Sequence, residues 1–463
     1  MFGFNTAVKG LLASQRSLYI VNHNISNINT KGYSRQQGVQ RATTPFHMTG
    51  VGMLGTGTTI EDIIRMRDSY IDFKYWNENA PKGEWIVKRD GLEELEKLFG
   101  EPSDNSFRKY LDDFYLALDN MSKNPSDMSF REPVKENVLA LTRHINETAK
   151  RLQDMKKEQE FSMETMERRI NDLAIQITSL NKQIYATELD GRKANDLRDR
   201  RELLIDELSE IVDIRADEST DGKYVVSIGG VSLVDHTNTF KVKLAEDFSE
   251  LQWSNGSKVS LRSGQLKGLL DIYNGDGVNN SYRGIPYYMD RLNQFAREFA
   301  ESFNNQHKEG YTLDGEQGED FFVFSEEAEI EDSWAATITL HDDILRDLRN
   351  IAAAGDKAGD AEDAKNLLKL IALRDEKSPD DFIKSILSNL AVDSLQGRRM
   401  SETQDVVLRN IQSKRDSIQG VSYDEEMADM VRFQHSYVAS ARMISTMDII
   451  MDVTINRLGL VGR

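Results

Sequence analysis

The sequence has no cysteine and only seven prolines among its 463 residues. The lack of cysteine excludes a disulfide scaffold, a thiolate metal site and a cysteine nucleophile. Proline falls well below the roughly 5% of an average protein, so few helix breakers interrupt the chain. The composition therefore permits long helices.

The chain also lacks long apolar runs and net positive charge. No run approaches the roughly 20 apolar residues that a membrane-spanning helix requires, and the formal net charge is −19. Because no apolar run is long enough, we expect no membrane span. Because a negatively charged surface repels phosphate backbones, we expect no nucleic-acid partner. Lys9 and Arg16 interrupt the apolar N-terminal positions, so we expect no cleavable signal peptide. These features alone predict a cytoplasmic protein.

Helical periodicity dominates the chain. We therefore predict a mainly α fold with a smaller β part (α+β), in about three domains. Residues 1–83, a helix with an extended segment, and 421–463, a long helix, would together form one domain from both chain ends. The remaining segments are the two halves of a long-helix bundle, 84–213 and 263–420 (the second with short strands), and a small β-rich insertion, 214–262.

Both terminal helices show heptad spacing. Near the N-terminus Phe4, Leu11, Leu18 and Ile25 recur every seven residues, an a/d pattern typical of coiled coils, and Gly32 is a natural helix stop. Ser422 and Glu425 predict a capping box at the start of the last helix. The same spacing then recurs in that helix at Met430, Tyr437, Ile444, Met451 and Leu458. Because methionine packs adaptably, partner binding and plain core packing are both compatible with this stripe.

The clearest helical pattern lies in the middle of the chain. Apolar residues alternate spacings of three and four from Met163 to Ile184 and keep register back to Val138, with interruptions at Lys156 and Gln159. A periodic run of this length predicts a long bundle helix.

Two changes of pattern follow that helix. Asp190-Gly191 predicts a turn into a returning helix, whose apolar face runs from Leu197 to Ile211. From about Asp213, polar and apolar residues alternate between glycine turn signals, which predicts the strands of the insertion.

One segment matches a nucleotide-binding motif. Gly50, Gly52 and Gly55 satisfy G-x-G-x-x-G, but the flanking residues predict neither a buried strand before it nor a helix after it. A nucleotide-binding enzyme using this loop is kept as the alternative from a different class. The seven histidines form no pair at metal-ligand spacing on one helix, so we expect no catalytic residue, no cofactor and no metal. This pattern favours a structural role.

Both ends of the chain resemble a known family. Residues 22–35 read NHNISNINTKGYSR and resemble the N-terminal signature of flagellar rod, hook and hook-associated axial proteins. Residues 422–456 resemble the C-terminal helix of the same proteins, most closely that of the first hook-associated protein family at the hook–filament junction. Segments 194–204 and 302–322 resemble the middle of that family, so the resemblance covers nearly the whole chain.

The resemblance implies a structural adaptor that joins hook to filament, assembled as a ring at the distal end of the hook. Residues 4–28 would pair with 421–463 as an antiparallel coiled coil. The partners would be the hook protein, the second hook–filament junction protein and other copies in the ring. Another axial protein, of the hook or rod class, remains an alternative, although those proteins generally lack the long helix pair of 138–211.

The resemblance also implies a route and a destination. The flagellar type III apparatus would export the chain after a transient cytoplasmic stage, during which an export chaperone (FlgN-like) covers the C-terminal helix. The final location would be the bacterial flagellum, outside the cell, which replaces the cytoplasmic expectation.

Two sets of interface residues follow from the resemblance. The axial assembly interface would comprise Phe4, Leu11, Leu18, Asn24, Ile25, Asn27, Gly32, Tyr33 and Arg35. The C-terminal helix and export-chaperone interface would comprise Met430, Phe433, Tyr437, Ile444, Met447, Met451 and Ile455.

Overall fold

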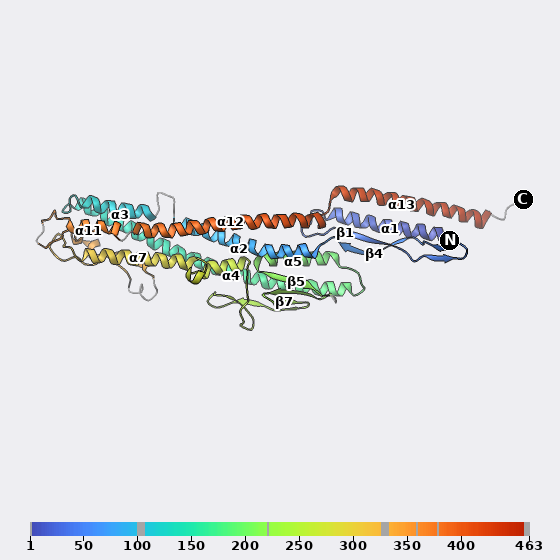
Figure 1. Ribbon diagram of the computed structural model, residues 1–463, viewed down its shortest axis with the longest axis horizontal. Helices are drawn as coiled ribbons and strands as arrows, with labels where there is room; N and C mark the ends of the chain where they lie inside the picture. The colour runs from blue at the N-terminus through green and yellow to red at the C-terminus, as the bar shows by residue number, and fades with distance from the viewer. Residues whose placement is uncertain are drawn as a thin grey trace.

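The chain forms an elongated, mainly helical molecule with both terminal helices at one end (Figure 1). This computed structural model describes residues 2–99, 107–219, 222–325, 333–357, 360–376 and 379–457. The predicted mainly α fold with a smaller β part is confirmed. Among the described residues, every helix is too short or too polar to cross a membrane.

The helices follow one another along the whole chain. They are α1 (Phe2–Ser26), α2 (Ser69–Phe99), α3 (Phe107–Met121), α4 (Met128–Glu188), α5 (Asn195–Ile211), α6 (Gln265–Asn274), α7 (Ile285–His307), α9 (Trp334–Thr337), α10 (Asp342–Arg346), α11 (Lys365–Glu376), α12 (Pro379–Gln419) and α13 (Tyr423–Asp452). Short helical turns occupy Val278–Asn280, Leu348–Asn350 and Val453–Arg457.

The strands pair antiparallel in small sheets. They are β1 (Gln36–Ala42), β2 (Phe46–Met48), β3 (Gly52–Leu54), β4 (Thr58–Arg65), β5 (Ile214–Glu218), β6 (Tyr224–Ile228), β7 (Val231–Asp235), β8 (Asn238–Thr239), β9 (Val242–Leu244), β10 (Leu251–Trp253), β11 (Phe322–Val323) and β12 (Thr339–Leu340). β5-β6-β7-β8 form one sheet, β9 pairs with β10, and β11 pairs with β12. β1 pairs with β4, and β2 with β3, so this stretch forms a long hairpin beside α1.

α4 is the longest helix and passes through two hydrophobic cores. Its first half, including Val138 and Ile145, packs with α3, α7 and α11 at the end of the molecule remote from the termini. Its second half, from Met163 to Ile177, packs with α5, α6 and the β5–β10 strands. The turn at Asp190-Gly191 lies between α4 and α5, and Gly191 adopts a φ of 83° that favours glycine.

The predicted segment boundaries can be placed on the observed helices and strands. The division at residues 83 and 84 falls inside α2, whereas that at 420 falls between α12 and α13. β5 to β10 span residues 214–253, within the predicted insertion. Residues 458–463 of the predicted C-terminal helix lie outside the described residues.

Candidate assembly site where the terminal helices meet

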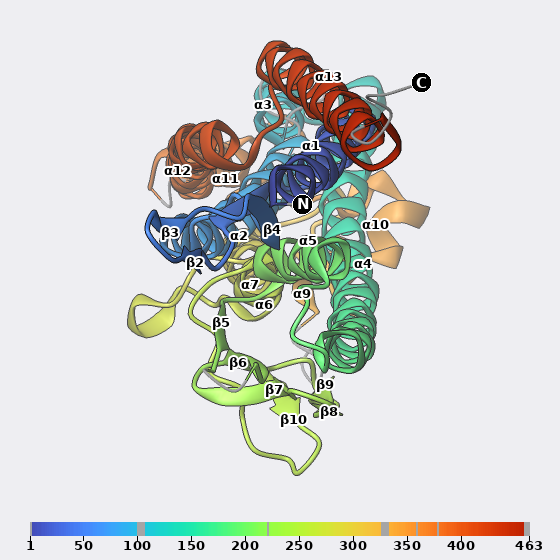
Figure 2. The ribbon, with the colours of Figure 1, turned by 90° about the vertical axis from the view of Figure 1, so that its right-hand side faces the viewer.

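α1 and α13 lie side by side and run antiparallel (Figures 1 and 2). A Cβ atom at Gly3 would lie 2.7 Å from the Met447 Cε, and one at Gly10 would lie 3.1 Å from the Ser440 Oγ. Near the other end of α1, Asn24 hydrogen bonds to Glu426. These contacts show how the two helices are aligned over most of their length.

Small side chains make up much of the buried face of α1. Ala13, Ser14 and Ser17 are buried and form the floor of a groove between α1, β1 and α13. The larger residues at heptad spacing, Phe4, Leu11, Leu18 and Ile25, are half-buried. α1 also packs on β1, since a Cβ at Gly38 would lie 3.0 Å from the Ile20 Cδ1. The close approach of α1 to its neighbours therefore depends on small residues.

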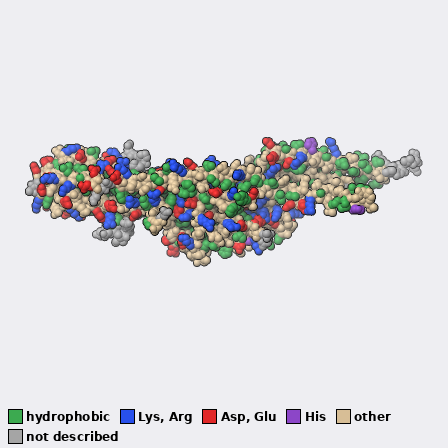
Figure 3. All heavy atoms as spheres, viewed as in Figure 1, with side chains coloured by type: hydrophobic (Ala, Val, Ile, Leu, Met, Phe, Trp, Pro, Cys, Tyr) green, Lys and Arg blue, Asp and Glu red, His purple; other side chains and the backbone are tan. Residues whose placement is uncertain are grey.

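Most of the apolar side chains of α13 are only partly buried or are exposed. Glu426 is the one residue of this helix that is buried. Of the predicted interface residues, Tyr437 and Ile455 are exposed, and the others are half-buried: Met430, Phe433, Ile444, Met447 and Met451. Further large apolar side chains of this helix are exposed: Val431, Val438, Met443, Ile449 and Ile450. Figure 3 shows hydrophobic side chains at the surface of this end of the molecule.

Asn24 forms the centre of the contact between the signature segment and α13. Its Nδ2 donates to the Gln36 carbonyl at 2.9 Å and to Glu426 Oε2 at 3.1 Å. Its Oδ1 accepts from the Gln36 N–H at 2.9 Å and from the Tyr33 hydroxyl at 2.7 Å. The amide thus uses both donors and both lone pairs, and the side chain faces inward.

Arg35 completes this contact. Its Nε donates to Glu426 Oε1 at 2.7 Å, and its Nη1 donates to Glu425 Oε2 at 2.9 Å. Its backbone N–H donates to the Gln419 carbonyl at 2.8 Å, where α12 ends. We call Asn24, Arg35 and Glu426 the clasp.

The predicted capping box at the start of α13 is wrong. Ser422 is the N-cap residue, but its side chain accepts no capping hydrogen bond. Glu425 points to Arg35 instead of back to the cap, because the guanidinium offers a charge-assisted partner. The acidic first turn still suits the positive end of the helix dipole.

The remaining signature residues shape the turn after α1. Asn27 Nδ2 donates to the His23 carbonyl at 2.9 Å. Gly32 has a φ of 80°, and a Cβ there would lie 3.2 Å from the Leu203 Cβ, so glycine meets both constraints. The Tyr33 hydroxyl gives its hydrogen to Asn24, so the His23 Nδ1, 2.9 Å away, must donate to it. Burial and nearby carboxylates raise the Tyr33 pKa, which keeps this donor protonated.

A cluster of buried charges lies behind the clasp. Arg65 donates to Asp199 Oδ1 at 2.8 Å and to Glu202 Oε1 at 2.9 Å. Arg67 lies 2.5 Å from Glu202 and 2.6 Å from Asp72. The cluster therefore ties the end of the β1–β4 hairpin to α2 and α5.

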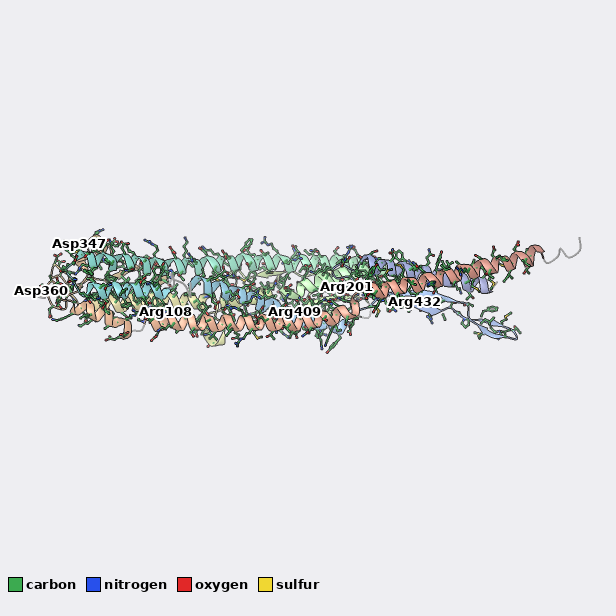
Figure 4. The ribbon with its side chains drawn as sticks, turned by 90° about the horizontal axis from the view of Figure 1, so that it is seen from above. Arg108, Arg201, Asp347, Asp360, Arg409 and Arg432 are labelled. Carbon is green, nitrogen blue, oxygen red and sulfur yellow. The ribbon has the colours of Figure 1, made fainter. Side chains whose placement is uncertain are left out.

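Arg415 brings α12 into the same cluster. Its Nε donates to Asp72 Oδ1 at 2.7 Å, and its Nη1 donates to Asp206 Oδ2 at 2.7 Å. Figure 4 labels Arg201 on α5 and Arg432 on α13, and the region where α12 ends and α13 begins lies between them. No pattern in the sequence predicts these charge pairs, since lone Arg and Asp residues far apart in a chain carry no spacing signal.

Burial and the arginines act in opposite directions on the pKa values of the carboxyl groups in this cluster. Burial would raise the pKa of Glu202, but the guanidiniums of Arg67 and Arg65 outweigh it and lower that pKa to about 2. For Asp199 and Asp206 burial prevails and raises the pKa despite their arginine partners. The arrangement is that of a structural ion network.

The segments that suggested other chemistry lie elsewhere. Gly50 lies in the β2–β3 turn, Gly52 begins β3 and Gly55 follows β3, and the next element is strand β4 instead of the helix that a dinucleotide site requires. Glu319, His341 and Asp343 bring three possible metal-ligand atoms within 4.8 Å of one another. The His341 Nδ1 already accepts a hydrogen bond from the Asp343 N–H at 3.2 Å, and the two carboxylates are exposed.

Comparison with solved structures finds a flagellar protein among the similar chains. The flagellar hook junction protein FlgK from Burkholderia pseudomallei is 20% identical, with a TM-score of 0.47 over 54% of this chain and 46% of that one.

Comparison with sequences gives stronger matches. Flagellar hook-associated protein 1 from Bacillus subtilis is 29% identical over 100% of this chain and 99% of that protein. The protein of the same name from Escherichia coli is 23% identical over 98% of this chain and 99% of that protein. Residues 92–322 match the flagellar hook-associated protein FlgK helical domain, and residues 412–458 match the C-terminal domain of the flagellar basal body rod FlgEFG proteins. The chain belongs to the FlgK family of flagellar hook-associated proteins.

Proposed function

We propose that this protein is the structural adaptor that joins hook to filament and assembles as a ring at the distal end of the hook. The observation that carries the proposal is the pairing of helices from both chain ends at one end of the molecule, with large apolar side chains left exposed. Exposed apolar patches of this kind mark interaction surfaces. The α4–α5 pair supports the junction role over a hook or rod role.

The proposed partners follow from the exposed surfaces of α1 and α13. The hook protein, the second hook–filament junction protein and neighbouring copies in the ring would cover the exposed residues of α1 and α13. Residues 4–28 and 421–463 would form an antiparallel coiled coil, and the two predicted sets of interface residues would lie at these contacts. Before assembly, a FlgN-like export chaperone would cover the methionine-rich side of α13.

The proposed route ends outside the cell. The flagellar type III apparatus would export the chain, and the chaperone would accompany it only in the cytoplasm. A chain without cysteine cannot form stray disulfides after export, which suits this route.

A deletion strain tests the junction role. Cells that lack this protein should carry hooks without filaments and release unpolymerised flagellin into the medium. Electron microscopy of the cells and immunoblotting of the medium measure both effects, and the intact gene should restore filaments. Normal filaments in the deletion strain would contradict the proposal.

Two matched variants then test whether α13 is the surface that acts. Ile449 on α13 is 64% exposed, and Phe161 on α4 is 66% exposed. Ile449→Asp should fail to restore filaments, because a carboxylate cannot be buried against an apolar neighbour. Phe161→Asp changes a side chain with a similar exposed fraction on the body of the molecule, and this variant should restore filaments.

A further inference from the structure

The clasp is the polar centre of an otherwise permissive helix pair. Glu426 is 1% exposed, and its two carboxylate oxygens each accept one hydrogen bond, Oε1 from Arg35 and Oε2 from Asn24. At Gly3 and Gly10, α1 meets the flexible Met447 and the small Ser440 of α13, and Ala13, Ser14 and Ser17 line the groove between the two helices together with Phe433. Such contacts specify alignment weakly, because small or adaptable side chains pack in many arrangements.

A slip of seven residues would conserve much of this packing. Gly10 faces Ser440 in the structure, and after a slip it would face Met447 or Phe433, both of them on the half-buried side of α13. Phe433 and Met447 are half-buried apolar residues one heptad to either side of Ser440, so a slipped α13 would still present apolar side chains to α1. The clasp has no such replacement, because a slipped Glu426 would leave Asn24 and Arg35 without their partner.

We infer that Asn24, Arg35 and Glu426 set the register of α13 on α1. This inference rests on the proposed pairing of the terminal helices and names the residues that make the pairing unique. A buried polar contact within an apolar seam is a known means of fixing helix register, at some cost in stability. Because the register decides which apolar side chains face outward, it also decides which surface meets the neighbours in the assembly.

The absence of cysteine makes the register measurable. The Gly10→Cys, Ser440→Cys pair reports the native register, since a Cβ at Gly10 lies 3.1 Å from the Ser440 Oγ. Pairing Gly10→Cys with Met447→Cys or with Phe433→Cys reports a slip of one heptad in either direction. Each pair is introduced into the purified full-length chain, oxidised, and scored by the mobility of the crosslinked product.

Glu426→Gln is the decisive variant, and Glu425→Gln is its matched control. Both remove one negative charge from the same helical turn and from the same Arg35, but Glu425 is 64% exposed. In Glu426→Gln we expect the slipped crosslinks to rise at least fivefold relative to the native one. In Glu425→Gln the ratio should stay within a factor of two of the parent chain.

Three outcomes would overturn the inference. The first is a native crosslink that dominates equally in both variants. The second is loss of every crosslink in Glu426→Gln while the body keeps its melting temperature, which would make Glu426 an anchor for attachment instead of a determinant of register. The third is a parent chain without the native crosslink, which would refute the pairing. The junction role is tested separately, by filaments in cells, so its failure is distinguishable.

Discussion

Among single residues, identity was easier to predict than orientation. The resemblance singled out Asn24, Tyr33 and Arg35, but nothing in the sequence shows that Asn24 is buried and faces the chain's own C-terminal helix. Asp72 and Arg415 meet although 343 positions separate them. A contact of this kind arises from tertiary packing alone, so no local pattern can reveal it.

His307 should make the far end of the molecule sensitive to acid. Burial lowers the pKa of His307 from the usual 6.5 to about 4. Its Nε2 accepts from the Ala352 N–H at 2.9 Å, and its Nδ1 donates to the Glu319 carbonyl at 2.7 Å, so protonation at Nε2 breaks the first bond. Because the folded-state pKa is lowered, the stabilisation is complete above pH 6.5 and is lost as the pH falls towards 4.

Urea unfolding at pH 7 and pH 5 measures this effect. The wild-type chain should lose about 2 kcal/mol more than His307→Gln between these pH values. His435→Gln, which changes an exposed histidine on α13, should behave as wild type. An equal loss in wild type and His307→Gln would show that other groups cause the acid sensitivity.

Among the elements, long helices were predictable and small-residue faces were not. The regular spacing from Met163 to Ile184 predicted the second half of α4, since large apolar residues mark a buried face. Beside Ile20 and Val21, α1 buries alanine and serine, and no hydrophobic pattern singles out these small residues. The capping box failed because a tertiary partner, Arg35, outcompeted the local bond of Glu425.

α5 is unusual because it buries a charged face, and Arg415 on α12 contacts this helix at Asp206. We therefore expect Arg415→Leu to lower the free energy of unfolding strongly. The substitution leaves Asp72 and Asp206 buried without the guanidinium that lies 2.7 Å from each. Removing one partner of a buried ion pair costs about 3–5 kcal/mol. Urea unfolding should show a loss of this size.

The control for this prediction lies on the same helix. Arg409 is 72% exposed in its side chain and pairs with Asp405, one turn away. Arg409→Leu should change the free energy of unfolding by about 0.5 kcal/mol or less. Similar losses in the two variants would mean that the buried network adds nothing beyond surface pairing.

At the scale of the whole molecule, α4 runs through two separate cores, to both of which α2 and α6 also contribute. Met155 belongs to the first core and Met163 to the second, and Lys156 and Gln159 lie between them. The interruption of the apolar pattern therefore marks the division between the cores. The sequence contained this signal, but only the fold gives it meaning, since each core draws most of its side chains from other segments.

Two cores on one helix should open separately, and matched truncations test this. Ile145 and Ile177 are both fully buried in α4, one in each core. Replacing either by alanine should cost about 2–5 kcal/mol locally. Ile145→Ala should speed hydrogen exchange in α3 and α7 and leave β6 protected, and Ile177→Ala should do the reverse, because opening free energies differ between cooperative units. If either substitution speeds exchange equally in both regions, the molecule unfolds as a single unit, and the division seen at Lys156 is one of packing alone.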